Sequence, residues 1–131
     1  MNPRLLVVDD EPELLAEIVS YLRRRGETVT QASSCAGARA VLQTEPVDIV
    51  ISDARMPDGS GVDLVRELLS DRGRHASCIL MTGHVDPTEG LQELSRAGIR
   101  ILYKPFALSE LHGEVVLAKE SLASPAGGER A

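Results

Sequence analysis

Five side chains that can do chemistry stand at or directly after the ends of apolar segments in this chain: Asp9, Asp10, Asp53, Thr82 and Lys104. Carboxylates held close together repel one another and raise one another's pKa, and a divalent cation relieves that repulsion. An all-oxygen site suits Mg²⁺, which takes one or two carboxylates together with phosphate oxygens. An aspartate can also act as a nucleophile and form an aspartyl phosphate. These residues therefore predict a magnesium site at which an aspartate accepts a phosphoryl group.

The remaining groups would assist such a transfer. Lys104 and the cation would neutralise charge on the phosphoryl oxygens, and Thr82 would donate a hydrogen bond to them. The backbone carbonyl of Arg55 is a further candidate metal ligand. Each residue alone also has a structural explanation: Asp10 as a helix N-cap, Thr82 as a strand end and Lys104 as a surface lysine. Their joint occurrence at the ends of successive strands is what favours the site.

The elements that must position these groups alternate along the chain. Apolar, β-branched runs predict five strands, at Leu5–Val8, Val29–Ala32, Asp48–Ser52, Cys78–Met81 and Ile99–Tyr103. Apolar residues at helical spacing follow each strand and predict five amphipathic helices. This alternation predicts an α/β fold, a doubly wound five-stranded parallel sheet with helices on both faces. Because parallel strands end at one edge of a sheet, the five side chains would meet there.

Apolar stripes predict which helix residues face the core. The third helix carries Val62, Leu64, Val65, Leu68 and Leu69, and the fifth carries Leu108, Leu111, Val115, Ala118 and Leu122. Gly26 would end the first helix, and Ser33 or Ser34 would cap the second. The fourth would begin at the capping box formed by residues 86–89 and run to Gly98.

Length and composition limit the class of protein. The chain has 131 residues and a net charge of −6, which fits one globular domain and argues against direct nucleic-acid binding. Cys35 and Cys78 form no ligand cluster, and Cys78 lies in an apolar run as expected of a core thiol. The first apolar run is too short for a signal peptide or a membrane span. We therefore expect a cytoplasmic protein without a membrane anchor.

Several short motifs together resemble one known family. Asp9-Asp10, Asp53 with Met56-Pro57-Asp58-Gly59 after it, Thr82-Gly83 and Lys104-Pro105-Phe106 resemble the receiver domain of two-component response regulators. The resemblance runs from about Leu5 to Leu122 and agrees in order, spacing and strand context. We expect a receiver domain over residues 3–122, with residues 123–131 as a disordered tail or truncated linker.

The resemblance implies a specific fold and mechanism. It implies a flavodoxin-like sheet with strand order 2-1-3-4-5. It implies that Asp53 accepts a phosphoryl group from a sensor histidine kinase or a histidine phosphotransfer protein. Mg²⁺ would be held by Asp10, Asp53 and the Arg55 carbonyl, with Asp9 acting largely through a metal-bound water. Thr82 and Lys104 would contact the phosphoryl oxygens, and the surface of helix 4, strand 5 and helix 5 would change.

Four positions are candidates for tuning the switch. The family often has an aromatic residue three positions before the lysine, where this chain has Ile101; Tyr103 lies on the same face of that strand. The residues two positions after Asp53 and Thr82 commonly tune phosphoryl lifetime in the family. Here they are Arg55 and His84, and we expect both to limit the access of water to the acyl phosphate.

The chain is expected to act as a switch rather than as an enzyme. No output domain follows the fifth helix, so we expect a stand-alone or an excised receiver. His112, Val116 and Lys119 lie off the core stripe of that helix and could serve a homodimer formed through helix 4, strand 5 and helix 5.

Two alternatives remain open. A phosphatase or phosphotransferase with an aspartyl nucleophile usually needs an acid two residues after it, where this chain has Arg55. A degenerate receiver would bind protein without being phosphorylated; the complete Asp, Thr and Lys set speaks against it, and Ile101 keeps it open. The cognate kinase, the output and the phosphoryl lifetime are not encoded in any recognisable motif.

Overall fold

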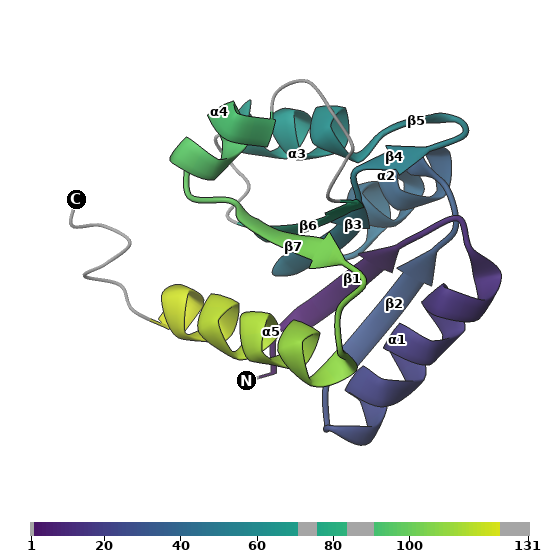
Figure 1. The fold of residues 1–131 in the computed structure, drawn as a ribbon, viewed down its shortest axis with the longest axis vertical. Helices are drawn as coiled ribbons and strands as arrows, with labels where there is room; N and C mark the ends of the chain where they lie inside the picture. The colour runs from purple at the N-terminus through teal and green to yellow at the C-terminus, as the bar shows by residue number, and fades with distance from the viewer. Residues whose placement is uncertain (1, 71–75, 84–90, 124–131) are drawn as a thin grey trace.

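The fold is seen in a computed structural model that describes residues 2–70, 76–83 and 91–123 (Figure 1). The strands are β1 (Arg4–Val8), β2 (Thr28–Ala32), β3 (Ile49–Asp53), β4 (Arg55–Met56), β5 (Gly59–Ser60), β6 (Ser77–Gly83) and β7 (Arg100–Lys104). The helices are α1 (Pro12–Arg24), α2 (Cys35–Thr44), α3 (Gly61–Ser70), α4 (Leu91–Arg96) and α5 (Leu108–Ala123).

Five strands form one parallel sheet in the order β2-β1-β3-β6-β7. Counted within this sheet, the order is 2-1-3-4-5. Each strand of this sheet is followed along the chain by a helix, and the helices between strands form the crossovers that parallel strands need. The predicted doubly wound α/β fold is therefore confirmed.

Helices cover both faces of the sheet because its strands are apolar on both faces. Leu5 and Val7 of β1 pack in a cluster with α1 and α5, whereas Leu6 and Val8 pack in a second cluster with α2, α3 and α4. Figure 1 shows these two helical layers on opposite sides of the sheet. Cys78 lies in the second cluster, and burial raises the pKa of its thiol to about 12, as expected of a core cysteine.

Two local predictions about helix ends can be compared with the structure. Ser34 caps α2, with its Oγ accepting a hydrogen bond from Gly37 N at 3.0 Å. The N-cap of α1 is Glu11 rather than Asp10, and no side chain caps that helix. Asp10 is therefore not explained as a helix cap. The predicted capping box at residues 86–89 lies outside the described residues.

The segment after β3 is not an irregular loop. β4 and β5 form a short antiparallel hairpin in which Arg55 pairs with Ser60 and Met56 pairs with Gly59. Two-residue strands carry no periodicity, so a hydropathy pattern cannot reveal them. The hairpin connects the end of β3 to the start of α3.

Two predicted core residues lie at the surface. Leu69 of α3 is 46% exposed and Leu122 of α5 is 37% exposed. Leu69 directly follows buried Leu68 and so lies off the buried face of α3, whereas Leu122 lies one turn beyond buried Ala118 of α5. The predicted apolar stripe is therefore too wide in α3 and one turn too long in α5.

Two polar residues of α5 are also not free for a partner. Lys119 Nζ lies 3.0 and 3.1 Å from the Glu27 carboxylate oxygens, and His112 Nε2 lies 3.5 Å from Glu27 Oε2. The side chain of Glu27 is only 4% exposed, so these contacts compensate a buried charge. Of the three residues predicted to serve a dimer, Val116 is 39% exposed.

None of the helices in the described part of the chain has the length and apolarity needed to cross a membrane.

Candidate functional site

The chemically active side chains lie together at the carboxyl edge of the sheet. Asp9 directly follows β1, and Asp53 is the last residue of β3. Thr82 stands near the end of β6, and Lys104 is the last residue of β7. Because β1, β3, β6 and β7 are parallel neighbours, four segments far apart in sequence deliver their polar residues to one place.

Lys104 joins the buried carboxylate of Asp9 to the largely buried carboxylate of Asp53. Its Nζ donates a hydrogen bond to Asp53 Oδ2 at 3.2 Å and lies 3.6 Å from Asp9 Oδ2. The Asp9 side chain is fully buried and that of Asp53 is 13% exposed. Glu11 Oε1 lies 3.7 Å from the same ammonium group, although the Glu11 side chain is largely exposed. One cation thus faces three acids.

The electrostatics of the site are dominated by burial. Burial raises the pKa of Asp9 and of Asp53 above the ordinary value, and the opposing effect of Lys104 does not reverse this. Burial alone would lower the pKa of Lys104, but the charges of Asp53 and Asp9 outweigh it and the pKa is raised. Among the described residues, the Lys104 ammonium therefore does not fully compensate the carboxylates, and the site favours additional positive charge.

The donor set fits a hard divalent cation. Asp9, Asp10 and Asp53 each offer a carboxylate oxygen, and these oxygens lie within 4.8 Å of one another. Asp9 Oδ1 accepts a hydrogen bond from Glu11 N at 2.9 Å, whereas Asp9 Oδ2 is buried and has no hydrogen-bond donor among the described residues. All-oxygen sites with a few carboxylates suit Mg²⁺.

Thr82 brings a second buried oxygen that has no hydrogen bond to any described residue. The residue is 1% exposed, and its Oγ1 makes no hydrogen bond within the part of the chain that the structure describes. Buried hydroxyl groups are almost always hydrogen-bonded, and leaving one unpaired costs about 1–3 kcal/mol. A group placed between Thr82 and the carboxylates would satisfy this hydroxyl.

The predicted tuning residues lie in environments that differ from one another. Arg55 lies in β4 with an exposed side chain, and its N–H points to Asp53 Oδ1 at 3.5 Å. Ile101 is partly buried against the cluster that includes Leu80. Tyr103 is 46% exposed, and the register of β6 and β7 pairs it with Thr82. His84 lies outside the described residues.

Residues that the sequence did not single out also shape the site. A Cβ at Gly61 would collide with the backbone carbonyl oxygen of Asp53, so only glycine fits there. Ser52, fully buried beneath the site, donates a hydrogen bond from its Oγ to that same oxygen at 2.9 Å. Glu11 could have been noticed as the third acid of the run that begins at Asp9. Gly61 could not, because its close contact exists only in the folded chain.

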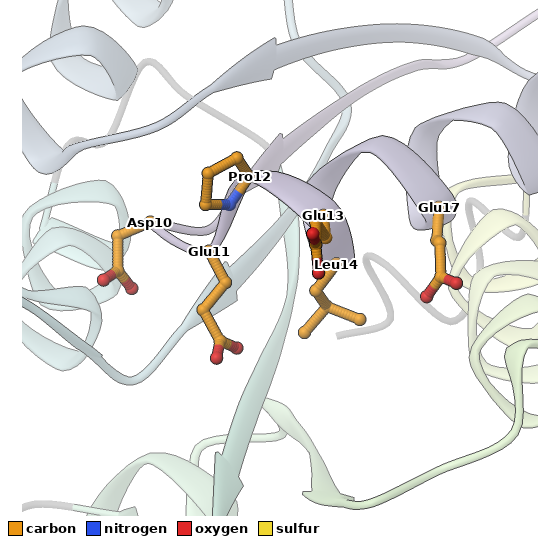
Figure 2. Close-up of a pocket in the computed structure, with 6 residues that line it drawn as sticks. All are labelled: Asp10, Glu11, Pro12, Glu13, Leu14 and Glu17. Carbon is orange, nitrogen blue, oxygen red and sulfur yellow. The ribbon is translucent and has the colours of Figure 1, made fainter.

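A surface hollow of about 550 Å³ opens beside the acidic residues at the start of α1. Figure 2 shows the carboxylates of Asp10, Glu11 and Glu17 pointing to the same side of the chain, and Leu14 adds apolar surface. The approach to the site along α1 is therefore acidic.

Comparisons with known proteins agree on one family. A family model for the response regulator receiver domain matches residues 5–116. The chain is 35% identical over 112 residues to the TorCAD operon transcriptional regulatory protein TorR of Escherichia coli O157:H7, which covers 85% of this chain and 47% of that protein. It is 36% identical over 107 residues to the transcriptional regulatory protein KdpE of Mycobacterium tuberculosis (strain CDC 1551 / Oshkosh), covering 81% and 46%. The chain thus spans about half the length of these curated relatives.

Solved structures give the same result. The receiver domain of the Francisella response regulator 1452 matches with a TM-score of 0.79 and 28% identity, covering 92% of this chain and 99% of that one. The response regulator receiver domain protein from Clostridium thermocellum matches with a TM-score of 0.78 and 30% identity, covering 92% and 98%. FixJ-N matches with a TM-score of 0.78 and 28% identity, covering 92% and 95%.

Proposed function

The chain belongs to the response regulator receiver domain family, and we propose that its Asp53 accepts a phosphoryl group from a sensor histidine kinase or a histidine phosphotransfer protein. The observation that carries this proposal is the position of the Asp53 carboxylate. It is hydrogen-bonded to Lys104 and shares a small space with the carboxylates of Asp9 and Asp10. Because the Asp53 carboxylate is partly buried, a phosphoryl donor can reach it while most water is kept away.

In the proposed reaction a carboxylate oxygen of Asp53 attacks the phosphorus of a phosphohistidine. The P–N bond breaks, its electron pair returns to the imidazole of the donor, and an acyl phosphate forms on Asp53. Lys104 would hold the phosphoryl oxygens by charge, and Thr82 would donate a hydrogen bond to one of them. The Thr82 hydroxyl, which is buried and has no hydrogen-bond partner among the described residues, supports this second role.

We assign Mg²⁺ binding to Asp10, Asp53 and the backbone carbonyl of Arg55, with Asp9 contributing largely through a water. When bound, the ion would supply positive charge that the transferring phosphoryl group needs. The crowding of three carboxylate oxygens and the raised pKa of Asp9 and Asp53 support this assignment. The protein residues would hold Asp53 in position whether or not the donor is present.

Phosphorylation would act through the surface formed by α4, β7 and α5. Thr82 would move toward the phosphoryl group, and Ile101 and Tyr103 on β7 would respond to that movement. Tyr103 is the cross-strand partner of Thr82 in the sheet register, which supports its participation. Exposed Tyr103, Val116 and Leu117 make this surface a candidate for a homodimer. Light scattering with and without beryllofluoride, a phosphoryl mimic, tests it: a doubled mass supports the dimer and an unchanged mass refutes it.

Arg55 and His84 are assigned to the lifetime of the acyl phosphate. The exposed Arg55 side chain stands two residues from Asp53 and would limit the approach of water. Replacing each residue by alanine should shorten the phosphoryl half-life, measured as loss of phosphate from the isolated phosphoprotein. An unchanged half-life in both variants would remove this role.

The chain is proposed to be a cytoplasmic switch domain rather than an enzyme with its own substrate. Incubation with acetyl phosphate and Mg²⁺ separates the possibilities. One stable, hydroxylamine-labile phosphate per chain supports the receiver function. Rapid multiple turnover would indicate a phosphatase or phosphotransferase, and no adduct would indicate a domain that only binds protein. Arg55 cannot serve as the second acid of the former class, and the complete set of Asp53, Thr82 and Lys104 speaks against the latter.

A further inference from the structure

Asp58, in the hairpin that follows β3, caps the N-terminus of α2. Its Oδ1 accepts a hydrogen bond from Cys35 N at 3.0 Å, and its Oδ2 accepts one from Ala36 N at 3.0 Å. These amides belong to the first turn of α2, where backbone N–H groups have no partner within the helix. They hold the pKa of Asp58 below its ordinary value. Asp58 thus connects the hairpin to two residues of α2 that lie 23 and 22 positions earlier in the chain.

The next residue shows that this contact is close as well as polar. A Cβ at Gly59 would lie 3.3 Å from Cys35 Sγ, closer than most side-chain contacts allow. Cys35 is itself fully buried. The tip of the hairpin is therefore packed against α2 and hydrogen-bonded to it.

The opposite end of the hairpin is fixed to Ala54, the residue after the phosphoacceptor, and through it to β6. Gly61 N donates a hydrogen bond to Ala54 O at 3.0 Å, and Ala54 N donates one to Met81 O at 2.8 Å. Met56 within the hairpin is 8% exposed and packs in the core. Arg55, whose backbone carbonyl is the proposed metal ligand, lies between these two anchors.

We propose that Asp58 is a positioning residue for Mg²⁺: by holding the hairpin against α2, it fixes the backbone of Arg55 and so sets the affinity of the site for the ion. The inference rests on the proposed function, because it assumes that Mg²⁺ binds at Asp53. Groups that orient metal ligands typically change metal affinity by about 10–100-fold when removed. Asp58 itself would not touch the ion.

The test compares Mg²⁺ affinity, measured by isothermal titration calorimetry, in Asp58→Ala and in Ser34→Ala. Both variants remove a cap from the same helix, since Ser34 Oγ accepts from Gly37 N, and both should lower the melting temperature similarly. Only Asp58→Ala also releases the hairpin. We expect its Mg²⁺ dissociation constant to rise about tenfold, with Ser34→Ala unchanged. Equal affinities in wild type and Asp58→Ala, or equal losses in both variants, would overturn the inference.

Two further variants separate the effect of the Asp58 charge from the effect of its hydrogen bonds. Asp58→Asn keeps one acceptor oxygen, so its affinity should fall between wild type and Asp58→Ala. Asp63→Asn removes an exposed carboxylate at the start of α3 without touching the hairpin tip and should bind Mg²⁺ normally. A loss in Asp58→Ala that disappears at high salt and is matched by Asp63→Asn would make it a charge effect and contradict the proposal. If wild type binds no Mg²⁺, the proposed function fails first, and the two failures are thus distinguishable.

Discussion

Lys104 Nζ and Asp53 Oδ2 lie 3.2 Å apart although the two residues are separated by 51 positions in the chain. The contact exists because β3 and β7 are both hydrogen-bonded to β6 and end at the same edge of the sheet. It places one ammonium group at the carboxylate that we propose as phosphoacceptor. The contact therefore links the topology of the fold to the chemistry of the site.

Replacing Lys104 by methionine should slow phosphorylation of Asp53 by acetyl phosphate. Loss of one preorganised charge that faces a transferring group typically costs about 100-fold or more in rate. Lys104→Arg keeps the charge but alters its geometry, so its phosphorylation rate should lie between those of wild type and Lys104→Met. The rate constant for phosphoprotein formation is the measurement, with far-UV circular dichroism to verify folding. A wild-type rate in Lys104→Met would show that this ammonium has no part in the transfer.

Gly61→Ala should damage the fold and the site together. The added Cβ would meet the backbone carbonyl of Asp53, which cannot move without shifting the phosphoacceptor. Gly113→Ala is the matched control, because a Cβ there meets nothing within 4 Å and alanine favours the interior of α5. We expect Gly113→Ala to raise the free energy of unfolding by about 0.5–1 kcal/mol. Urea denaturation measures the free energy of unfolding of both variants. Equal values for Gly61→Ala and Gly113→Ala would contradict the packing described.

The prediction of the fold succeeded where burial leaves a direct trace in sequence. Leu5–Val8 reads as a strand covered on both faces because four consecutive apolar residues need two apolar layers, and the structure provides them. Once the strands are parallel, Asp9, Asp53 and Lys104 must share an edge, so their proximity could be foreseen. Their roles in phosphoryl transfer stay predictions.

What could not be foreseen depends on contacts between distant segments. The hydrogen bonds of Asp58 to α2 and of Lys119 to Glu27 join residues 23 and 92 positions apart, and neither pair forms a local pattern. The apolar stripe of α5 includes Leu122 by spacing, but Leu122 is 37% exposed although Ala118, one turn earlier, is buried. Helical periodicity identifies a face of a helix and not the length of that face that is covered.

Removing Lys119 should destabilise the protein without affecting the site. The Glu27 carboxylate is nearly fully buried, and breaking a buried ion pair leaves a charge that costs about 3 kcal/mol. Lys119→Met should therefore lower the free energy of unfolding by roughly that amount, reduced by the nearby His112. The double variant Lys119→Met, Glu27→Gln should recover most of the loss. A single variant as stable as wild type would show that the pair contributes nothing.

Asp58 should make a measurable contribution to stability against acid. Its pKa in the folded protein is lowered from 3.8 by hydrogen bonds from Cys35 and Ala36, so the folded state prefers the charged form. The stabilisation is present above the pKa of the unfolded chain and is lost as pH falls from about 3.8 through the lower folded pKa. Denaturation midpoints measured across this window should fall less steeply in Asp58→Asn. Identical pH profiles would show that the carboxylate charge is not stabilised by the helix.

The most direct test of the account is the location of the phosphoryl group. After incubation with acetyl phosphate and Mg²⁺, borohydride reduction converts an aspartyl phosphate to homoserine, which peptide mass spectrometry locates. We predict homoserine at position 53 alone, and none when Mg²⁺ is chelated or when Asp53 is replaced by asparagine. Homoserine at another aspartate, or none at all in the wild-type protein, would contradict the central claim.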